Sequence, residues 1–496
     1  MKLIIKTFLF LIAFTSLAQE KNVLADRSFW KESPTMESLK QKIAEGNDAT
    51  ALNENGFDAT VYALIEKADD DVITYLLSLE GNPVDKRTHD SRIYLHWAAY
   101  AGKTEMVKTL LEKGSSISAL DSHSATPLVF AAGSGLTDPE IYNLFIANGV
   151  NLSEEKSEDG ANTLLLAAPY LNDENEIEYF VSKGISLNST DTDGNGIFNY
   201  AAKRGNINFL KALVKKEVDH KTLNKNGGNA FLFAAQGTRG FENNLEVYTY
   251  LQSLGLQPNI VTKNGYTPLH RLAYSNTDKS IFEFFLNAGA NVNQQDAEGN
   301  TPFLNAASRN TMEIVQLLSK SVINFNTANK KGETALMLAV GNNSPKVVEF
   351  LLQKGSDALA KDTNGNSVAY YLAESFNVKK MEEFESKLKM LEEKGLKLNT
   401  IQANGNTLYH IAAKENNLEL LKRLSAFGIS VNTANTEGLT ALHQAAMKAE
   451  DDQMMKYLIS IGADKNAKTG FEETAFNLAT ENELLQKENI DLKFLN

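Results

Sequence analysis

Histidine is the residue type of this chain best suited to proton transfer and metal binding near neutral pH. The chain has seven histidines, and four of them close a short recurring segment, as in Thr267-Pro268-Leu269-His270. The four are His96, His270, His410 and His443. The other three fall in polar segments that predict loops, and they are His89, His123 and His220.

The separation of His89 and His123 is close to the period of the recurring segment, so we expect them on adjacent loop tips. Zinc needs several ligands that converge on one point, and no carboxylate spacing around these two residues supplies them. We therefore predict no metal site.

Other catalytic chemistry is poorly supported by the sequence. The chain has no cysteine, which excludes disulfides, thiolate catalysis and cysteine-ligated zinc. It contains no nucleophile elbow, phosphate-binding glycine loop or zinc-protease motif. Pairs such as Asn264-Gly265 and Asn364-Gly365 resemble fragments of calcium loops, but turn chemistry explains them. We predict neither an enzyme nor a cofactor.

The elements that carry these residues repeat thirteen times, with a period of roughly 33 residues that is typical of stacked repeats. The first residues of the thirteen copies are Asp58, Ile93, Thr126, Asn162, Gly196, Asn229, Thr267, Thr301, Thr334, Ser367, Thr407, Thr440 and Thr474. A repeat of this length cannot bury its apolar face alone, so neighbouring copies must stack.

Each copy predicts two helices. Thr-Pro is a favourable helix start, because Thr caps the free N–H groups and Pro fits the first turn. A pair of small residues, such as Ala306-Ala307, lets another helix approach closely. Apolar residues at helical spacing follow, as in Val347 and Leu351, and a glycine such as Gly355 ends the second helix.

This pattern resembles the ankyrin repeat, whose consensus is Thr-Pro-Leu-His-x-Ala within a unit of about 33 residues. The resemblance covers residues 55–480 and implies an all-α solenoid of stacked helix-turn-helix units with short β-hairpin or loop connections. It also implies that His96, His270, His410 and His443 are structural and bond to backbone groups of the turn. Residues 19–54 would then hold a flexible lead (19–27) and a capping helix, and 481–496 a C-terminal cap and tail.

Residues 1–18 have the composition of a secretory signal: Lys2 and Lys6, an apolar run from Leu9 to Phe14, and small residues at Ser16 and Ala18. We expect cleavage after Ala18 and export to a bacterial periplasm or beyond, with no stable membrane insertion afterwards. The alternative is an N-terminal anchor. The formal net charge is −13, or −15 after cleavage, which makes nucleic acid an unfavourable ligand.

Three copies carry insertions, and the shortest adds three residues to the copy at Thr126, near Gly135 to Pro139. The segment Gly237–Glu242 predicts a loop, and the charged stretch between Phe376 and Gly395 predicts a longer helix within a protruding, solvated helical pair. Pro169 is expected to shorten the first helix of its copy. Insertions of this kind are either contact sites or tolerated surface variation.

The resemblance places a protein partner on the loop tips and on the exposed side of the first helices, a concave face. Tyr, Trp and Arg dominate such interfaces. The candidate contact residues are Tyr100, Tyr170, Tyr274, Trp97, Arg271, Arg204, Arg309 and Tyr266. The alternative is that these side chains pack at the joints between repeats.

We therefore expect an exported, monomeric, non-enzymatic scaffold that binds another protein. The alternative is a periplasmic helper that protects or assembles another exported protein, such as a redox or transport component.

Overall fold

The computed structural model describes residues 22–496, so the expected signal sequence, residues 1–18, lies outside the described residues. The described part of the chain contains 28 α-helices and no extended strand. It divides into two compact units: unit 1 runs to Ala201 and includes Asn208–Asp219, and unit 2 consists of Ala202–Ile207 and His220–Asn496.

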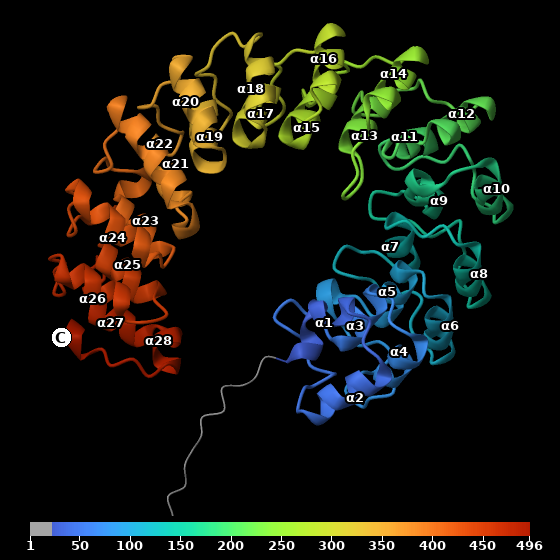
Figure 1. Ribbon diagram of the computed structural model, residues 1–496, viewed down its shortest axis with the longest axis horizontal. Coiled ribbons are helices and arrows are strands. Elements are labelled where there is room, and N and C mark those ends of the chain that lie inside the picture. Colours follow the sequence, from blue (N-terminus) through green and yellow to red (C-terminus); the bar gives the residue numbers. More distant parts are fainter. Residues whose placement is uncertain (1–21) are drawn as a thin grey trace, which may run out of the picture. The chain divides into compact units, whose positions relative to one another are not determined.

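The helices of each unit form pairs, and successive pairs lie side by side (Figure 1). In unit 1 the first helices of the pairs are α3 (Ala59–Ile65), α5 (Tyr94–Ala101), α7 (Pro127–Gly133), α9 (Thr163–Ala167) and α11 (Ile197–Ala202). Their second helices are α4 (Asp70–Leu76), α6 (Thr104–Glu112), α8 (Pro139–Ala147), α10 (Glu174–Ser182) and α12 (Ile207–Lys215).

Unit 2 is also built from helix pairs of this kind. Its first helices are α13 (Ala230–Gln236), α15 (Pro268–Ser275), α17 (Pro302–Arg309), α19 (Ala335–Asn342), α21 (Val368–Glu374), α23 (Leu408–Lys414), α25 (Ala441–Lys448) and α27 (Ala475–Glu481). Its second helices are α14 (Leu245–Ser253), α16 (Lys279–Asn287), α18 (Met312–Ser319), α20 (Pro345–Gln353), α22 (Met381–Glu393), α24 (Leu418–Leu424), α26 (Gln453–Ser460) and α28 (Glu483–Lys487). The predicted helix-turn-helix repeats are thus confirmed.

The first helices begin as their sequences predict. The Thr301 hydroxyl accepts a hydrogen bond from the Leu304 N–H at 3.1 Å, and Pro302 follows in the first turn. Asn can replace Thr as the cap in copies without Thr-Pro: the Asn162 side chain accepts from the Leu165 N–H at 3.0 Å, whereas Ile93 supplies no side-chain cap. Pro169 lies in a 3-10 turn directly after α9, which ends at Ala167, as expected.

Packing joins helices of the same kind within each unit. First helices contact the first helices of adjacent pairs, as α15 does with α17, and second helices contact second helices, as α16 does with α18. The small residues Ala306 and Ala307 are fully buried at the former joint, while Phe282 and Phe285 fill the space beneath the second helices. Each joint therefore buries a share of one continuous core.

The connections are turns rather than extended hairpins. Several are closed by one isolated antiparallel bridge, such as Ala328 with Thr334 and Lys361 with Ser367. Adjacent loop tips are also joined through the backbone: the Lys330 N–H donates to the Glu298 carbonyl at 2.9 Å, and the Lys263 N–H donates to the Asn226 carbonyl at 2.8 Å. These bonds fix each tip relative to the next.

Two expectations are corrected at the ends and insertions. Residues 22–27 are not a flexible lead, because Leu24 is fully buried and its carbonyl accepts a hydrogen bond from the Trp30 indole at 2.9 Å. Trp30 lies in α1 (Arg27–Lys31), ahead of the expected capping helix α2 (Met36–Ala44).

The long insertion is likewise not a protruding helical pair. It forms a single 13-residue helix, α22, that packs against α20 and buries Phe384, Leu388 and Leu391. The buried Lys387 ammonium donates to the Val340 carbonyl at 2.8 Å. The added turns therefore extend the stack, because their apolar residues keep helical spacing.

Candidate functional site

The four repeat histidines connect each first helix to the next loop. The backbone N–H of Thr267 donates to His270 Nδ1 at 3.1 Å, and His270 Nε2 donates to the Asn300 carbonyl at 3.1 Å. The equivalent outer bonds join His96 to Ala125, His410 to Leu439 and His443 to Ala467. An imidazole that donates from one nitrogen and accepts at the other is neutral.

Burial favours that neutral form. It lowers the pKa of His96 to about 4 and also lowers the pKa values of His270, His410 and His443, because a charged imidazole would be desolvated. Both nitrogens are used in backbone bonds, so these rings are not available as general bases or metal ligands.

The loop histidines occupy a different setting. His89 and His123 both approach the Asp90 carboxylate, at 3.4 and 3.5 Å, and Arg92 binds the same oxygen at 3.0 Å. Within residues 22–496 no group of three or more His, Asp or Glu side chains is placed to hold a metal ion. In the same range no helix is long and apolar enough to cross a membrane.

Tyr100 and Trp97, both on α5, have different exposures. The Tyr100 side chain is 42% exposed, and its ring stacks on Phe130 with centroids 5.6 Å apart. Trp97 is only 5% exposed and its indole N–H donates to the Thr88 hydroxyl at 2.9 Å. The expectation of a solvent-facing side chain therefore does not hold for Trp97, which supports the neighbouring loop.

Tyr170 and Arg204 are half-buried. The Tyr170 ring covers Gly135, where a Cβ would lie 3.1 Å from it. The Arg204 guanidinium lies 4.8 Å from the centre of the Phe241 ring, in the Gly237–Glu242 insertion. That insertion is the expected loop, and Thr238 and Phe241 close it with a single bridge. Both expected contact residues thus make contacts between elements and keep only part of their surface exposed.

Tyr274 and Arg309 form an exposed pair on α15 and α17. Tyr274 is 40% exposed, and the Arg309 guanidinium lies 5.2 Å from the centre of its ring. Arginine over an aromatic face is a favourable arrangement that leaves the guanidinium edge free to donate. The structure brings together these two residues, which the sequence assigns to different repeats.

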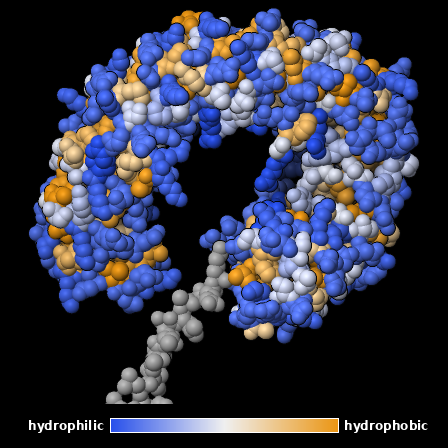
Figure 2. Space-filling view, viewed as in Figure 1, coloured by the Kyte–Doolittle hydropathy of each residue, from blue (hydrophilic) through white to orange (hydrophobic). Residues whose placement is uncertain are grey.

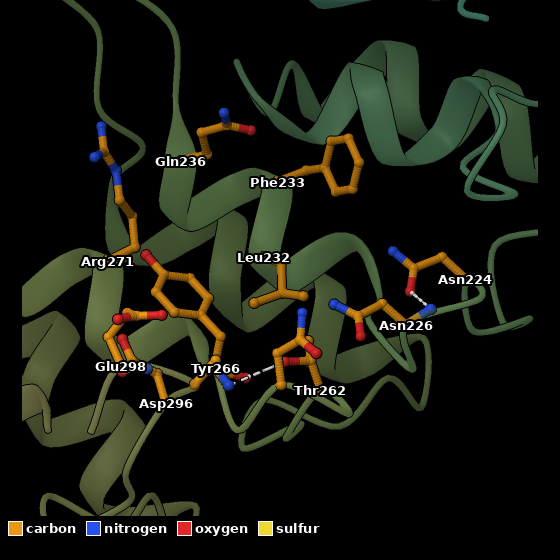
Figure 3. Close-up of a pocket in the computed structure, with 12 residues that line it drawn as sticks. Asn224, Asn226, Leu232, Phe233, Gln236, Thr262, Tyr266, Arg271, Asp296 and Glu298 are labelled. Atoms are coloured by element: carbon orange, nitrogen blue, oxygen red, sulfur yellow. Dashed lines mark hydrogen bonds between the residues drawn. The ribbon is translucent and has the colours of Figure 1, made fainter. Parts of the chain in front are cut away.

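Tyr266 and Arg271 meet at a hollow of about 550 Å³ in unit 2 (Figure 3). Leu232 and Phe233 from α13 and Thr262 from the following loop also line it. Tyr266 stacks on His270, with ring centroids 5.2 Å apart. Burial raises the pKa of the Tyr266 hydroxyl, although the charge of Arg271 opposes that rise, so this hydroxyl stays protonated and able to donate.

Polar groups complete the rim of the hollow. They are Asn224, Asn226, Gln236, Asn264, Asp296 and Glu298. Asp296 uses one carboxylate oxygen to accept from the Glu298 and Asn300 N–H groups, both at 2.9 Å, and so orders its own loop. The hollow therefore has an apolar wall, aromatic side chains and a mixed polar rim, which are the usual features of a binding site.

The sequence reasoning missed a set of asparagines that connect repeats. The Asn343 side chain donates to the carbonyls of Ala307 and Asn310, at 3.0 and 2.9 Å. Asn310 bonds in the same way to Ala273 and Asn276 of the preceding pair. The recurrence of Asn directly after the first helix, one period apart, is a signal that could have revealed them.

Surface hydropathy gives no competing site in the face that Figure 2 shows, where hydrophobic residues are scattered among hydrophilic ones. Single exposed apolar side chains of this kind are normal for a folded protein.

Comparison with known proteins agrees with this architecture. The family model for ankyrin repeats (3 copies) matches the chain in seven segments: six overlapping ones that together cover residues 32–362, and one over residues 371–469. Among curated proteins, the E3 ubiquitin-protein ligase KEG of Arabidopsis thaliana is 21% identical over 312 residues, 59% of this chain and 18% of the relative.

Two further relatives match shorter stretches. The transient receptor potential cation channel subfamily A member 1 homolog of Caenorhabditis elegans is 28% identical over 123 residues, 25% of this chain and 10% of the channel. The ankyrin repeat protein FPV031 of fowlpox virus is 29% identical over 171 residues, 33% of this chain and 49% of that protein. The chain thus spans less than half the length of these relatives. Since the family model covers most of the chain, the protein belongs to the ankyrin-repeat family.

Proposed function

We propose that this protein is an exported, non-enzymatic scaffold that binds another protein through its loop tips and first helices. The observation that carries the proposal is the hollow at Tyr266 and Arg271, which joins an apolar wall to exposed polar groups on loops that backbone bonds hold in place. A preformed surface of this kind binds at low ordering cost.

The family supports the binding role, because ankyrin repeats generally mediate contacts between proteins. Export is supported by the composition of residues 1–18, with Lys2 and Lys6 ahead of a short apolar run and Ser16 and Ala18 before Gln19. We further propose that the mature chain acts as a monomer, with Tyr100 and Tyr274 as exposed aromatic contacts.

Cross-linking in the cell envelope tests the binding role. Tagged protein is cross-linked in its native cells, and captured proteins are identified by mass spectrometry, beside a Tyr100→Ala, Tyr170→Ala, Tyr274→Ala variant. One dominant partner that the variant loses supports the scaffold and these contacts. If another envelope enzyme instead loses activity in a deletion strain while no stable complex is captured, the helper role replaces it.

Export is tested separately. N-terminal sequencing of protein recovered from the periplasmic and culture fractions should begin at Gln19. Protein that stays in the cytoplasm with Met1 intact would contradict export and leave the binding role untouched.

A further inference from the structure

The hollow at Tyr266 lies in a basic part of an acidic protein. Residues 202–207 and 220–331 of unit 2 carry twelve Lys and Arg against seven Asp and Glu, although the whole chain has a net charge of −13. A local excess of this sign attracts an acidic partner that the rest of the chain would repel.

In this part of unit 2 the cations concentrate on the loops and first helices, where the carboxylates of Glu242, Asp278, Asp296 and Glu298 are fewer. Three carboxylates lie on the second helices, Glu246 on α14, Glu283 on α16 and Glu313 on α18. Most of the cations instead lie on the loops and first helices, among them Arg204, Lys225, Lys263, Arg271, Arg309 and Lys330. The basic character therefore belongs to the side of the repeats that holds the hollow.

The polar groups around the hollow suit a polypeptide chain. Within the described residues the side chains of Asn226, Gln236 and Asn264 make no hydrogen bond, and the Arg271 guanidinium forms no ion pair. A carboxamide both donates and accepts, so it matches the N–H and C=O groups of an extended backbone. Leu232 and Phe233 offer an apolar wall for a side chain between them.

The spacing of the cations fits the same ligand. Lys225, Lys263 and Lys330 take the same position in their loops, four residues before the first residue of the copy. Packed helices stand about 8–10 Å apart, and an extended chain advances about 3.3 Å per residue. An acidic residue at every third position would therefore advance by one repeat and meet Lys225, Lys263 and Lys330, with Ala297 at the equivalent position of the copy between the last two.

We propose that the loops and first helices of residues 203–207 and 220–331, all in unit 2, bind an extended acidic segment of the partner protein, with Arg271 and Lys263 pairing its carboxylates and Leu232 and Phe233 holding an apolar side chain. The inference rests on the proposed function, since it states which partner chemistry the scaffold recognises. Nucleic acid fits less well, because the carboxylates of Asp296 and Glu298 line the same hollow and repel a continuous phosphate chain.

The test uses fluorescence anisotropy with defined probes. The acidic probe is a labelled peptide of about fifteen residues with Glu at every third position and Leu and Ser between, long enough to cross several repeats. Its controls are the same peptide with Gln in place of Glu, and a single-stranded oligothymidylate. The protein is the full chain lacking residues 1–18, as wild type, as an Arg271→Gln, Lys263→Gln variant, and as Lys320→Gln, whose exposed cation follows α18.

We expect the Glu peptide to bind the wild type and Lys320→Gln within about twofold of each other, and the double variant at least about tenfold more weakly, since charge-assisted bonds are the strong ones. The wild type should bind the Gln peptide no more tightly than the double variant binds the Glu peptide. Four results would each overturn the inference. The first two are equal binding of the Glu and Gln peptides, and unchanged binding of the Glu peptide by the double variant. The other two are tighter binding of the oligothymidylate, and self-association of the wild type that the double variant abolishes.

This outcome is separable from that of the proposed function. If cross-linking captures a partner in equal yield with wild type and the Arg271→Gln, Lys263→Gln variant, the scaffold stands and the acidic-segment inference fails. If no partner is captured although the Glu peptide binds as expected, the proposed function fails on its own test.

Discussion

The imidazole Nε2 of His410 donates a hydrogen bond of 2.9 Å to the carbonyl of Leu439, the residue just before the next copy begins. The other nitrogen accepts the Thr407 N–H at 3.1 Å, so one neutral ring holds the start of its own helix and the end of the following loop. A protonated ring could not accept that N–H.

This relationship predicts that the protein loses stability in mild acid. Because burial lowers the pKa of the four repeat histidines, and that of His96 to about 4, the unfolded chain takes up protons below its ordinary histidine pKa of about 6.5 while the folded chain does not. The free energy of unfolding should therefore be highest above that pH and fall as the pH drops towards 4. His96 alone would account for on the order of 3 kcal/mol.

Urea unfolding followed by circular dichroism between pH 7.5 and 4.5 measures this fall. His96→Gln should be less stable at pH 7.5 and decline less steeply. Parallel curves for wild type and variant would show that this ring does not set the dependence.

Asn343 is expected to matter far more than its neighbour Asn342. Asn343→Ala removes the donor for the Ala307 and Asn310 carbonyls and should lower the free energy of unfolding by about 1–3 kcal/mol. Asn342 is exposed and makes one hydrogen bond of 3.3 Å within its own helix. Asn342→Ala should therefore change the free energy of unfolding by less than about 0.5 kcal/mol. Equal effects in urea unfolding would mean that Asn343 does not join the repeats.

Two glycines in equivalent Asn-Gly turns should respond differently to alanine. Both have positive φ, +73° for Gly265 and +93° for Gly365, so either substitution costs about 1–2 kcal/mol. At Gly265 the new Cβ would also collide with the Gln295 carbonyl oxygen, whereas nothing lies within 4 Å at Gly365. Gly265→Ala should thus show the larger drop in thermal midpoint, and an equal drop would place the loop tips farther apart than the structure does.

We predict that Arg92 is essential for the stability of the loop that contains Asp121. Its guanidinium binds Asp121 at 2.9 Å, stands 4.1 Å from the centre of the Phe130 ring, and is largely buried with Asp121. Arg92→Gln leaves that carboxylate without its charged partner and should cost about 3–5 kcal/mol. Arg239→Gln, at an exposed loop residue, is the control and should leave the free energy of unfolding almost unchanged. Hydrogen exchange at the amides of His123 and Ala125 would show whether the loss of stability in Arg92→Gln is local to this loop.

The sequence by itself determined the repeat number and the helix pairs. A near-constant period repeated thirteen times leaves one architecture, since each copy must bury its apolar face on the next. Helix starts were equally readable, because a Thr, Ser, Asn or Asp that caps a helix does so through atoms within three residues. The role of His270 followed from the family resemblance for the same local reason, since it bonds to Thr267.

Only the tertiary structure decided which side chains remain available at the surface. Trp97 and Tyr100 lie three residues apart on α5 and both pack against Phe130 of the next repeat. Trp97 is nevertheless buried, with its indole bonded to Thr88, whereas Tyr100 is exposed. The hollow at Tyr266 and Arg271 likewise combines side chains of three copies. Periodicity describes what every copy shares, whereas a binding surface depends on how copies differ where they meet, and those contacts are set by packing across repeats.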